Sequence, residues 1–468
     1  MGSRKIFFRA DASSAIGYGH FIRTLALADM LKDDFDCTFF TVSPTPYQMS
    51  EMEKVCAWKA LPQETAFRDF LEILQGDEIV VLDNYFYSTE YQQQVKNKGC
   101  MLVCIDDIHD KHYVADVVIN HSLSNTDLFD VEPYTKLCLG FDYALLRRPF
   151  LEAIKQSHYQ KQKTGIISIC FGGSDYYDMT GKCIETLLKN YPSIFITAIV
   201  GDAYQPKKGK VINDRVRYLS RLSAQEMADL FLQSDWVICS ASTTCIEALA
   251  CGANVAAGWY VDNQADFYAE IVNKGLVYPL GHLEKDNEIH INLPHSQNNT
   301  LKLSVDIKST IVKLFGELPD DEYLRDARKQ DVDLIFEWAN DSTVRSFSFN
   351  SEPIPYENHI KWFARLLDSD CAKMYIMIKD GVPVGQIRIS IIGDEAEIGY
   401  SIAKESRGKG YGTRIVKLLE SECRGNGSLK RLVARVKSVN ELSSKIFVSN
   451  GYKQISCEDN VITFIKEL

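Results

Sequence analysis

Apolar and polar positions alternate along the first 260 residues in two series of short apolar runs separated by amphipathic stretches. The first series predicts buried strands at residues 5–10, 37–42, 78–84, 101–107 and 116–122, and the second at 165–175, 194–202, 216–220, 235–242 and 253–259. Short uninterrupted apolar runs are typical of parallel strands that are covered on both faces. Because parallel strands need crossover connections, the pattern predicts two α/β domains in tandem.

The pattern changes after about residue 283. Polar stretches, with "HSQNNT" and "ELPDD", flank one helical segment at 305–315 and predict a linker. A strand, two helices and three closely spaced strands at 374–380, 383–392 and 395–403 follow, and the pair Asp380-Gly381 predicts a hairpin. An antiparallel sheet of this kind predicts a separate α+β domain. The expected domains are residues 1–155, 156–318 and 319–468.

Length, net charge and the lengths of the apolar runs argue against several classes of protein. A chain of 468 residues is expected to build two or three hydrophobic cores. The net charge of −11 argues against nucleic acid as the main partner, because phosphate binding needs a basic face. No apolar run approaches the roughly 20 residues that span a bilayer, and the N-terminus lacks a signal-peptide pattern.

The 13 cysteines are scattered without a CxxC pair. Neither a disulfide framework nor a zinc site is therefore expected, and no other metal site is indicated. Cytoplasmic location without a membrane partner is the expectation, and the oligomeric state stays open.

A glycine-rich turn at residues 406–420, "SRGKGYGTRIVKLLE", joins a strand to an amphipathic helix. Glycines let backbone N–H groups converge, and a helix N-terminus adds partial positive charge. We therefore expect a pyrophosphate cradle with two added basic side chains. The turn consists of Arg407, Gly408, Lys409, Gly410, Tyr411 and Gly412.

This turn resembles the acetyl-CoA-binding motif of the GNAT family of N-acetyltransferases, Gln/Arg-x-x-Gly-x-Gly-Ala/Gly. The resemblance extends over about residues 320–468, where Asn440 matches the family's cofactor-contacting asparagine. It implies an α+β GNAT domain with acetyl-CoA as co-substrate. The residues implied for binding it are Ile402, Arg407, Gly408, Lys409, Gly410, Tyr411, Gly412, Thr413 and Asn440.

Acyl transfer to an amine requires removal of a proton before attack, and the departing thiolate can take one up. Glu397, on the strand before the turn, is the expected base, directly or through water; the alternative is a solvated strand glutamate. The position of the family's general-acid tyrosine is Phe447 here, so the chain departs from the pattern. Tyr400, Tyr452 or unassisted departure of the thiolate are the alternatives.

A second glycine pair lies near the N-terminus, in "IGYGHFIRTLALA". Gly17 and Gly19 predict a tight turn after the first strand, and His20 begins the following helix. A side chain there faces the cleft at the carboxyl ends of the strands. Because a helix N-terminus disfavours the imidazolium, we expect a neutral ring able to take a proton near pH 7. The alternative is a structural histidine.

The second α/β domain carries polar clusters at three strand ends. "CFGGSD" is typical of a diphosphate-binding turn, and "SASTT" crowds a helix start, with Glu247 placed one turn further to accept from ribose hydroxyls. Helix capping is the alternative role of such residues. Together they predict a nucleotide-sugar site formed by Gly172, Gly173, Ser174, Asp175, Ser242, Thr243, Glu247, Asn263 and Gln264.

Residues 9–258 resemble the UDP-2,4-diacetamido-2,4,6-trideoxy-β-L-altropyranose hydrolases of pseudaminic acid biosynthesis, which are related in fold to GT-B glycosyltransferases. The matching stretches are "RADASSAIGYGHFIRTLALA", "VVLDNYFYSTEYQ", "LGFDYALLRRPF", "CFGGSD" and "SASTTCIEALACG". The resemblance implies two Rossmann-like domains in a GT-B arrangement. It also implies metal-independent hydrolysis with inversion, which releases UDP.

In that hydrolysis, the resemblance implies that His20 is the base that activates water and that Asp11 holds its ring. Tyr85 with Asp83 is expected to line the sugar pocket. Three further residues are expected to bind substrate: Gly17, Gly19 and Arg23.

The two resemblances together imply a bifunctional enzyme. It would acetylate UDP-4-amino-4,6-dideoxy-β-L-AltNAc with acetyl-CoA and then hydrolyse the UDP-2,4-diacetamido sugar. The alternative is a GT-B glycosyltransferase, which releases UDP only with an acceptor present, fused to a protein-directed, other-sugar-directed or inactive acetyltransferase domain.

Overall fold

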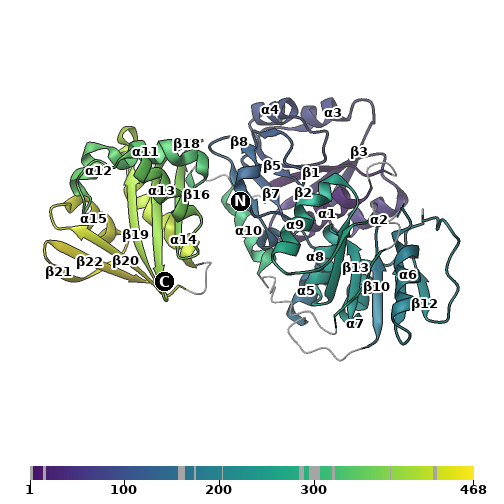
Figure 1. The fold of residues 1–468 in the computed structure, drawn as a ribbon. Coiled ribbons are helices and arrows are strands. Elements are labelled where there is room, and N and C mark those ends of the chain that lie inside the picture. The colour runs from purple at the N-terminus through teal and green to yellow at the C-terminus, as the bar shows by residue number, and fades with distance from the viewer. Residues whose placement is uncertain are drawn as a thin grey trace. The chain divides into compact units, whose positions relative to one another are not determined.

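The structure, a computed structural model, describes residues 4–13, 17–156, 164–172, 175, 177–202, 204–283, 289–294, 306–318, 322–379, 381–424 and 429–468. The chain divides into two compact units (Figure 1). Unit 1 comprises Met1–Asn125 and Cys138–Gly316, and unit 2 comprises Thr126–Leu137 and Glu317–Leu468.

The first sheet of unit 1 has the strand order β3-β2-β1-β4-β5-β7-β9. β1 lies between β2 and β4 and runs parallel to both, so the carboxyl ends of β1 and β4 meet at one edge. All five residues of β4 are buried, as expected for a strand covered on both faces. The strands are β1 (Lys5–Ala10), β2 (Asp36–Val42), β3 (Ala57–Leu61), β4 (Ile79–Asp83), β5 (Met101–Ile105), β7 (Val117–Asn120) and β9 (Lys136–Leu139).

The second sheet of unit 1 has the order β12-β11-β10-β13-β14-β15, and each neighbouring pair is parallel. Its central strand β13 is buried along its whole length. The parallel strands expected from the second series of apolar runs are therefore confirmed. The strands are β10 (Ile166–Cys170), β11 (Phe195–Ile199), β12 (Val216–Leu219), β13 (Trp236–Ser240), β14 (Asn254–Trp259) and β15 (Tyr278–His282).

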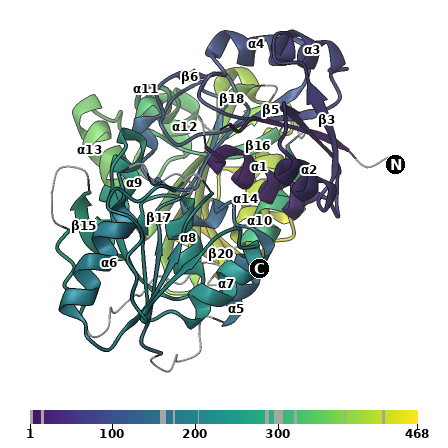
Figure 2. The ribbon, with the colours of Figure 1, turned by 90° about the vertical axis from the view of Figure 1, so that its right-hand side faces the viewer.

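Helices separate most of these strands, and several begin with local capping. The side chain of Thr45 accepts from the backbone N–H of Gln48 at the start of α2, and Ser223 accepts from Glu226 at the start of α7. α5, α7 and α8 lie side by side (Figures 1 and 2). The remaining elements of unit 1 are α1 (Gly19–Leu31), α2 (Pro46–Glu53), α3 (Ala66–Ile73), α4 (Thr89–Asn97), β6 (His112–Tyr113), η2 (Phe141–Tyr143), α5 (Arg148–Gln156), α6 (Met179–Asn190), α7 (Ala224–Gln233), α8 (Thr243–Ala250), η3 (Asp262–Gln264), α9 (Ala265–Asn273) and α10 (Ile307–Glu317).

Unit 2 contains a seven-stranded sheet of order β16-β17-β18-β19-β20-β22-β21. β16 to β19 are antiparallel neighbours, whereas β19 and β20 are parallel. Their pairing ends at Ile398 and Ala434, although β19 continues to Ile402, so the two strands separate beyond this point. The strands of this sheet are β16 (Glu322–Asp326), β17 (Ala372–Lys379), β18 (Val382–Ile392), β19 (Glu395–Ile402), β20 (Arg431–Lys437), β21 (Lys453–Glu458) and β22 (Val461–Glu467), and β8 (Asp130–Val131) lies outside it.

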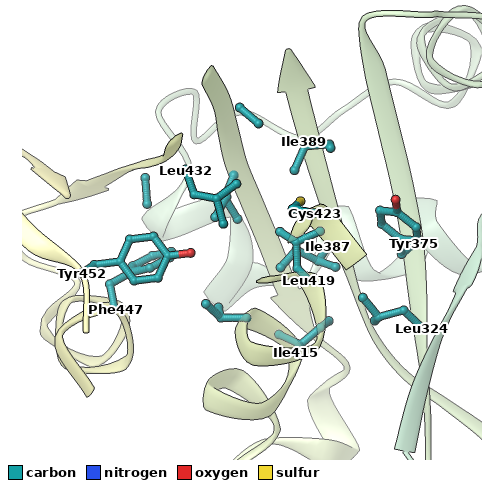
Figure 3. Packing of buried hydrophobic residues seen from close by; sticks show 14 of the residues in the cluster. Leu324, Tyr375, Ile387, Ile389, Ile415, Leu419, Cys423, Leu432, Phe447 and Tyr452 are labelled. Carbon is teal, nitrogen blue, oxygen red and sulfur yellow. The ribbon is translucent and has the colours of Figure 1, made fainter. Parts of the chain in front are cut away.

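The main core of unit 2 lies between this sheet and α14. Ile415 and Leu419 of α14 pack against Ile387 of β18, and Phe447 lies beside Tyr452 in the same core (Figure 3). The helices of unit 2 are η1 (Thr126–Leu128), η4 (Lys329–Asp331), α11 (Val332–Asn340), α12 (Ser342–Phe347), α13 (Tyr356–Leu367), η5 (Lys404–Ser406), α14 (Tyr411–Arg424) and α15 (Glu441–Ser449).

Residues 126–137, which the expected domain boundaries placed in the N-terminal domain, cluster with unit 2. We call them the strap. Arg325, which is almost fully buried, donates from Nε to the carbonyl oxygen of Pro133 at 2.6 Å. Arg328 donates to the carbonyl oxygen of Thr135, and Tyr323 to that of Tyr134. The apolar pattern could not reveal this assignment, because it depends on side-chain contacts nearly 200 residues apart in the chain.

Candidate functional site

His20 lies at the start of α1, at the carboxyl edge of the first sheet, and its side chain is buried against Asp83 at the end of β4. Nδ1 of His20 lies 2.7 Å from Oδ1 of Asp83. Nη2 of Arg23 also lies 3.0 Å from Nδ1, but it donates to Oδ1 of Asp83 at 2.6 Å. Because the carboxylate can only accept, we place the ring hydrogen on Nδ1, which leaves the lone pair of Nε2 as the proton acceptor. In this tautomer the ring has the acceptor that the predicted role as a base needs.

Arg23, one helical turn after His20, holds the same carboxylate. Its Nε donates to Oδ2 of Asp83 at 2.7 Å, and its Nη2 donates to Oδ1 at 2.6 Å. Thr24 adds a hydrogen bond to Oδ2 at 2.7 Å. Asp83 is fully buried with all of these partners, so it does not line a sugar pocket as the sequence predicted; it positions His20.

The charge state of Asp83 follows from these contacts. Burial alone raises the pKa of Asp83, but the charges of Arg23 and His20 and their hydrogen bonds outweigh it and hold the pKa below the ordinary value. The carboxylate therefore remains ionised and keeps the orientation of the imidazole fixed.

Asp11, which the sequence predicted to hold the histidine ring, contacts other groups. Its carboxylate pairs with the buried Arg9, and Oδ1 accepts from the backbone N–H of Val42 at 2.7 Å. Asn84 accepts from the backbone N–H of Asp11 at 2.8 Å. Asp11 thus ties together the ends of β1, β2 and β4, and the expected contact with His20 is wrong.

A cavity lies between the carboxyl ends of the two sheets of unit 1. It encloses about 730 Å³ of empty space, including open solvent at its mouth, which is within the usual size of a ligand pocket. The first half of unit 1 contributes Gly19, His20, Arg23, Tyr85, Asp107, His121, Ser122 and Leu123; the second contributes Ala241, Ser242, Thr243, Asn263, Gln264 and Phe267.

Tyr85 connects the two halves of the cavity. Its ring meets the ring of His20 edge-on at 4.5 Å, and its hydroxyl donates to Oδ2 of Asp107 at 3.2 Å. Asn263, from the second half, donates to the same hydroxyl at 2.9 Å. Burial raises the pKa of Tyr85 and Asp107 raises it further, so the phenol stays protonated. Tyr85 and Asn263, both predicted site residues, line the cavity.

The glycine pair before His20 leaves space at the cavity. Gly17 has φ +81, where a side chain would be strained, and no atom of the described residues lies within 4 Å of the position of a Cβ on either Gly17 or Gly19. Gly19 lines the cavity.

The predicted diphosphate turn is described only in part, since Gly173 and Ser174 lie outside the described residues. Gly172 has φ +85. Asp175 is buried, and its carboxylate accepts from the backbone N–H groups of Met179 and Thr180, both at 2.8 Å. Its expected role in substrate binding is corrected: Asp175 caps the start of α6. Ser242, Thr243 and Gln264, which were predicted to bind the nucleotide sugar, line the cavity.

Glu247 is buried and its carboxylate is already bound on both oxygens. Arg147 donates from Nε to Oε1 at 2.8 Å and from Nη2 to Oε2 at 3.0 Å. The expected free acceptor for ribose hydroxyls is therefore replaced by a bidentate ion pair between the residue before α5 and α8.

Three cavity or support residues were missed by the sequence analysis: Asp107, His121 and Arg147. Asp107 accepts from Nη1 of Arg23 at 2.8 Å. Burial lowers the pKa of His121 to about 4, and the charge of Arg23 acts in the same direction. The runs "CIDDIHD" and "VINHS", each directly after a strand, were the available signals for Asp107 and His121.

In unit 2, the glycine-rich turn at residues 407–412 presents backbone N–H groups that have no hydrogen-bond partner among the described residues. Gly408 and Gly410 have φ +76 and +85, and within the described part of the chain the backbone N–H groups of residues 408–412 have no hydrogen-bond partner. The turn follows β19 where it separates from β20 and leads directly into α14, as expected for an anion cradle. This arrangement can hold a pyrophosphate.

The charge of Arg407 is already paired, so it is not free to meet a pyrophosphate at the turn. Its Nη2 donates to Oδ1 of Asp341 at 2.6 Å, and its Nε donates to the carbonyl oxygen of Ile402 at 3.2 Å. Burial raises the pKa of Asp341, but Arg407 and two backbone donors lower it overall. Arg407 therefore braces the turn against α12, and its expected contribution of free charge is corrected.

The other implied acetyl-CoA residues surround the turn. A Cβ on Gly412 would lie 2.6 Å from Cδ1 of Ile446, so α15 approaches here closely. Asn440 caps α15 by accepting from the backbone N–H of Ser443 at 3.1 Å, which leaves its amide N–H₂ as the group for a ligand. Lys409, Tyr411 and Thr413 lie on the turn or at the start of α14.

The candidate acids and bases of unit 2 lie on β19, on α15 and just after α15. Phe447 is buried in the core, so it has no proton to give and no access to a ligand. Tyr400 lies 3.1 Å through its hydroxyl from Oγ of Ser443, and burial raises its pKa, so it keeps its proton. Tyr452 is almost fully buried. Glu397 is half-buried and accepts from Nη2 of Arg435 at 2.8 Å.

The described residues contain no group of three or more His, Cys, Asp or Glu side chains arranged to hold a metal ion. They also include no helix that is both long and apolar enough to cross a lipid bilayer.

Comparisons with known proteins assign the C-terminal part. Residues 323–453 match the acetyltransferase (GNAT) domain family. An uncharacterized protein of Methanocaldococcus jannaschii is 24% identical over 96% of this chain and 97% of its own length. The UDP-2,4-diacetamido-2,4,6-trideoxy-beta-L-altropyranose hydrolase of Campylobacter jejuni is 27% identical over 58% of this chain and 97% of its own length.

Among solved structures, the spermidine N-acetyltransferase of Vibrio cholerae in complex with CoA and spermine is 15% identical, covers 31% of this chain and 95% of its own, and has a TM-score of 0.30. The chain is a mixed α/β protein in which residues 323–453 match the GNAT acetyltransferase domain family and the N-terminal part has distant similarity to a UDP-sugar hydrolase.

Proposed function

We propose that the chain is a bifunctional enzyme that N-acetylates UDP-4-amino-4,6-dideoxy-β-L-AltNAc with acetyl-CoA and hydrolyses UDP-2,4-diacetamido-2,4,6-trideoxy-β-L-altropyranose to UDP and the free sugar. The observation that carries the hydrolase half is the buried Asp83–His20 pair, with the Nε2 lone pair free at a cavity between two sheet edges. The two sheets then act as Rossmann-like halves in a GT-B arrangement, with UDP held by the second half.

In the hydrolysis, Nε2 of His20 takes the proton of a water whose oxygen attacks the anomeric carbon. The bond between that carbon and the diphosphate oxygen breaks, and the configuration inverts. Asp83 stabilises the imidazolium that forms, as carboxylates do in other histidine bases. Ser242 and Thr243, at the start of α8, donate hydrogen bonds to the departing diphosphate together with the helix N-terminus, so the reaction needs no metal.

In the acetyl transfer, the backbone N–H groups of residues 408–412 hold the pyrophosphate of acetyl-CoA. The amine of the sugar attacks the thioester carbon, and the carbon–sulfur bond breaks. Glu397 accepts the proton of the amine, directly or through water. The Tyr400 hydroxyl, which keeps its proton, is the group in this region that can protonate the thiolate.

The proposal is tested by mass spectrometry with the purified full chain, the UDP-amino sugar and acetyl-CoA. The substrate should first gain one acetyl group, and UDP and the diacetamido sugar should then appear. In His20→Ala the acetylated UDP-sugar should accumulate without UDP release, because the hydrolytic base is missing.

Unchanged UDP release in His20→Ala would exclude His20 as the base. UDP release only after addition of a sugar or lipid acceptor would favour a GT-B glycosyltransferase instead. Acetylation of peptide N-termini with no reaction of the UDP-amino sugar would contradict the acetyltransferase half while leaving the hydrolase half intact.

A further inference from the structure

One face of the sheet in unit 2 gathers positive charge. Ile387, Ile389, Leu432 and Ala434 point to the core beneath α14, so the alternate positions Arg388 on β18, and Arg435 and Lys437 on β20, lie on the opposite face. α12 lies beside this face, because Nζ of Lys437 donates to the carbonyl oxygen of Ser346, the residue after Arg345, at 3.4 Å. We call Arg345, Arg388, Arg435 and Lys437 the basic face.

Glu397 lies on the same face and its charge acts on Arg388, but one carboxylate does not balance four cations. Glu397 is bound by Arg435, at 2.8 Å from Nη2. Arg388 has no ion pair or hydrogen bond with any described residue. A surplus of positive charge in a chain of net charge −11 indicates that the face is built to meet an anion.

Arg345 is held in place without a counter-charge. Its Nη1 donates to the carbonyl oxygens of Asn350 at 3.2 Å and Glu352 at 3.3 Å, and its Nη2 donates to Oγ of Ser348 at 2.8 Å. Its Nε is buried without a partner among the described residues. An oriented guanidinium with an unused donor is the group that binds phosphate oxygens well.

Arg388 is also held in place, next to the point where β19 separates from β20. Its guanidinium lies over the ring of Trp362, 5.4 Å from the centroid, and its neighbour across the strands is Gly399, where a Cβ would lie 3.2 Å from Nε. Gly399 is the first residue of β19 after its pairing with β20 ends. The basic face therefore borders the opening between the separated strands.

We propose that the basic face binds the diphosphate of a nucleotide-linked amine acceptor while its amine reaches the opening between β19 and β20. The proposal rests on the proposed acetyltransferase function and adds the chemical group of the acceptor that the domain recognises, which is the diphosphate. A nucleotide-linked amino sugar carries this diphosphate, whereas the free amino sugar does not.

This selection would fix the order of the two reactions of the chain. Hydrolysis removes the diphosphate, so the released amino sugar would no longer be held by Arg388 and Arg345. Acetylation must then precede hydrolysis, as the proposed function requires.

The test compares acetylation of UDP-4-amino-4,6-dideoxy-β-L-AltNAc and of the corresponding free amino sugar by the full chain. Wild type should prefer the UDP-linked amine by about 100-fold in kcat/KM, since two charge-assisted contacts each contribute about tenfold. Arg388→Gln and Arg345→Gln should each raise the KM for the UDP-linked amine by about tenfold. The KM for acetyl-CoA, which also reports folding, should stay unchanged.

Arg431→Gln is the matched control, because Arg431 lies on β20 and its charge is already paired with Glu395 at 2.6 Å and Glu467 at 2.8 Å. It should leave both KM values unchanged. A rise in the KM for acetyl-CoA in Arg388→Gln would show that the basic face holds phosphates of the coenzyme and would overturn the proposal.

Equal use of the UDP-linked and free amines by wild type would overturn the diphosphate site while leaving the acetyltransferase function intact. No acetylation of the UDP-linked amine by wild type would contradict both the proposed function and this inference.

Discussion

Nδ1 of His20 lies 2.7 Å from Oδ1 of Asp83, and the two residues are 63 positions apart in the chain. The pair joins the first turn of α1 to the end of β4, so the tautomer of the histidine is set by the sheet and not by its own loop. Arg23 completes the arrangement by holding both oxygens of the same carboxylate.

Asp83→Asn should strongly reduce UDP release. An amide in place of the carboxylate can present N–H₂ to Nδ1, which favours the wrong tautomer and removes the charge that stabilises the imidazolium. Loss of a carboxylate behind a catalytic histidine lowers kcat by about 10³-fold or more. Steady-state UDP release measures the effect, and acetyl transfer in the same preparation should continue.

The matched comparison for Asp83→Asn is Asp11→Asn. Asp11 contacts Arg9 and Val42 and not His20, so this variant should lower the melting temperature while kcat for UDP release of the folded protein stays near wild type. A loss of kcat as large as in Asp83→Asn would restore Asp11 as the partner of the histidine.

Glu247→Gln should destabilise unit 1. It breaks the bidentate pair with Arg147, whose side chain keeps 20% of its surface exposed. Because a fully buried pair loses roughly 3–5 kcal/mol on removal of one partner, we expect about 2–3 kcal/mol here. Urea unfolding measures the loss. Full stability combined with weaker UDP binding would instead identify Glu247 as a ribose contact.

Acid should destabilise the protein through His121. Its pKa is about 4 in the folded protein against 6.5 ordinarily, so the unfolded chain binds the proton more readily between these values. Stability is therefore complete above about pH 6.5 and falls by about 3 kcal/mol as the pH drops to 4. Asp83, whose pKa is lowered, loses its contribution only below its ordinary 3.8.

Urea unfolding at several pH values tests this slope. His121→Asn retains an acceptor for the backbone N–H of Leu145, which His121 Nδ1 accepts at 3.2 Å, but it has no proton to gain. The variant should have a flatter stability profile between pH 4 and 6.5. An unchanged slope would assign the acid sensitivity to another group.

Gly410→Ala should weaken acetyl-CoA binding. Gly410 has φ +85, so a Cβ strains the turn by about 1 kcal/mol and moves the N–H groups that hold the pyrophosphate. Loss of one charge-assisted hydrogen bond corresponds to a rise of about tenfold in the KM for acetyl-CoA.

Gly393→Ala is the control for backbone strain, because Gly393 has φ +66 in the turn between β18 and β19. It should lower stability by a similar amount without changing the KM for acetyl-CoA. Equal effects of both variants on that KM would mean that strain in the sheet, and not the cradle, is responsible.

The strands of both parallel sheets were largely predictable, because strands covered on both faces are written as unbroken apolar runs. β3, with the sequence "AWKAL", was missed for the converse reason: it lies at the edge of its sheet with most side chains at least partly exposed. The α10 helix and the three long strands of unit 2 were predicted within a few residues.

The site was predictable where local sequence carries the chemistry and not where long-range pairing does. His20 and the turn at Gly410 are recognisable from glycine spacing beside a helix start. The partner of His20 is not, because Asp11 and Asp83 both follow strands whose ends meet at one edge. Glu247 was misread for the same reason, since Arg147 lies 100 residues away in the chain.

The strap has a consequence for how the chain is made. Pro133 and Arg325, which bind each other in unit 2, are 192 residues apart. At a synthesis rate of roughly 5–20 residues per second, the strap leaves the ribosome about 10–40 s before its arginine partners exist. Unit 2 therefore cannot complete its folding until Arg325 has been synthesised, long after the strap has left the ribosome. The strap must remain available until that time. A gene fragment that begins at residue 317 would encode the rest of unit 2 without the strap.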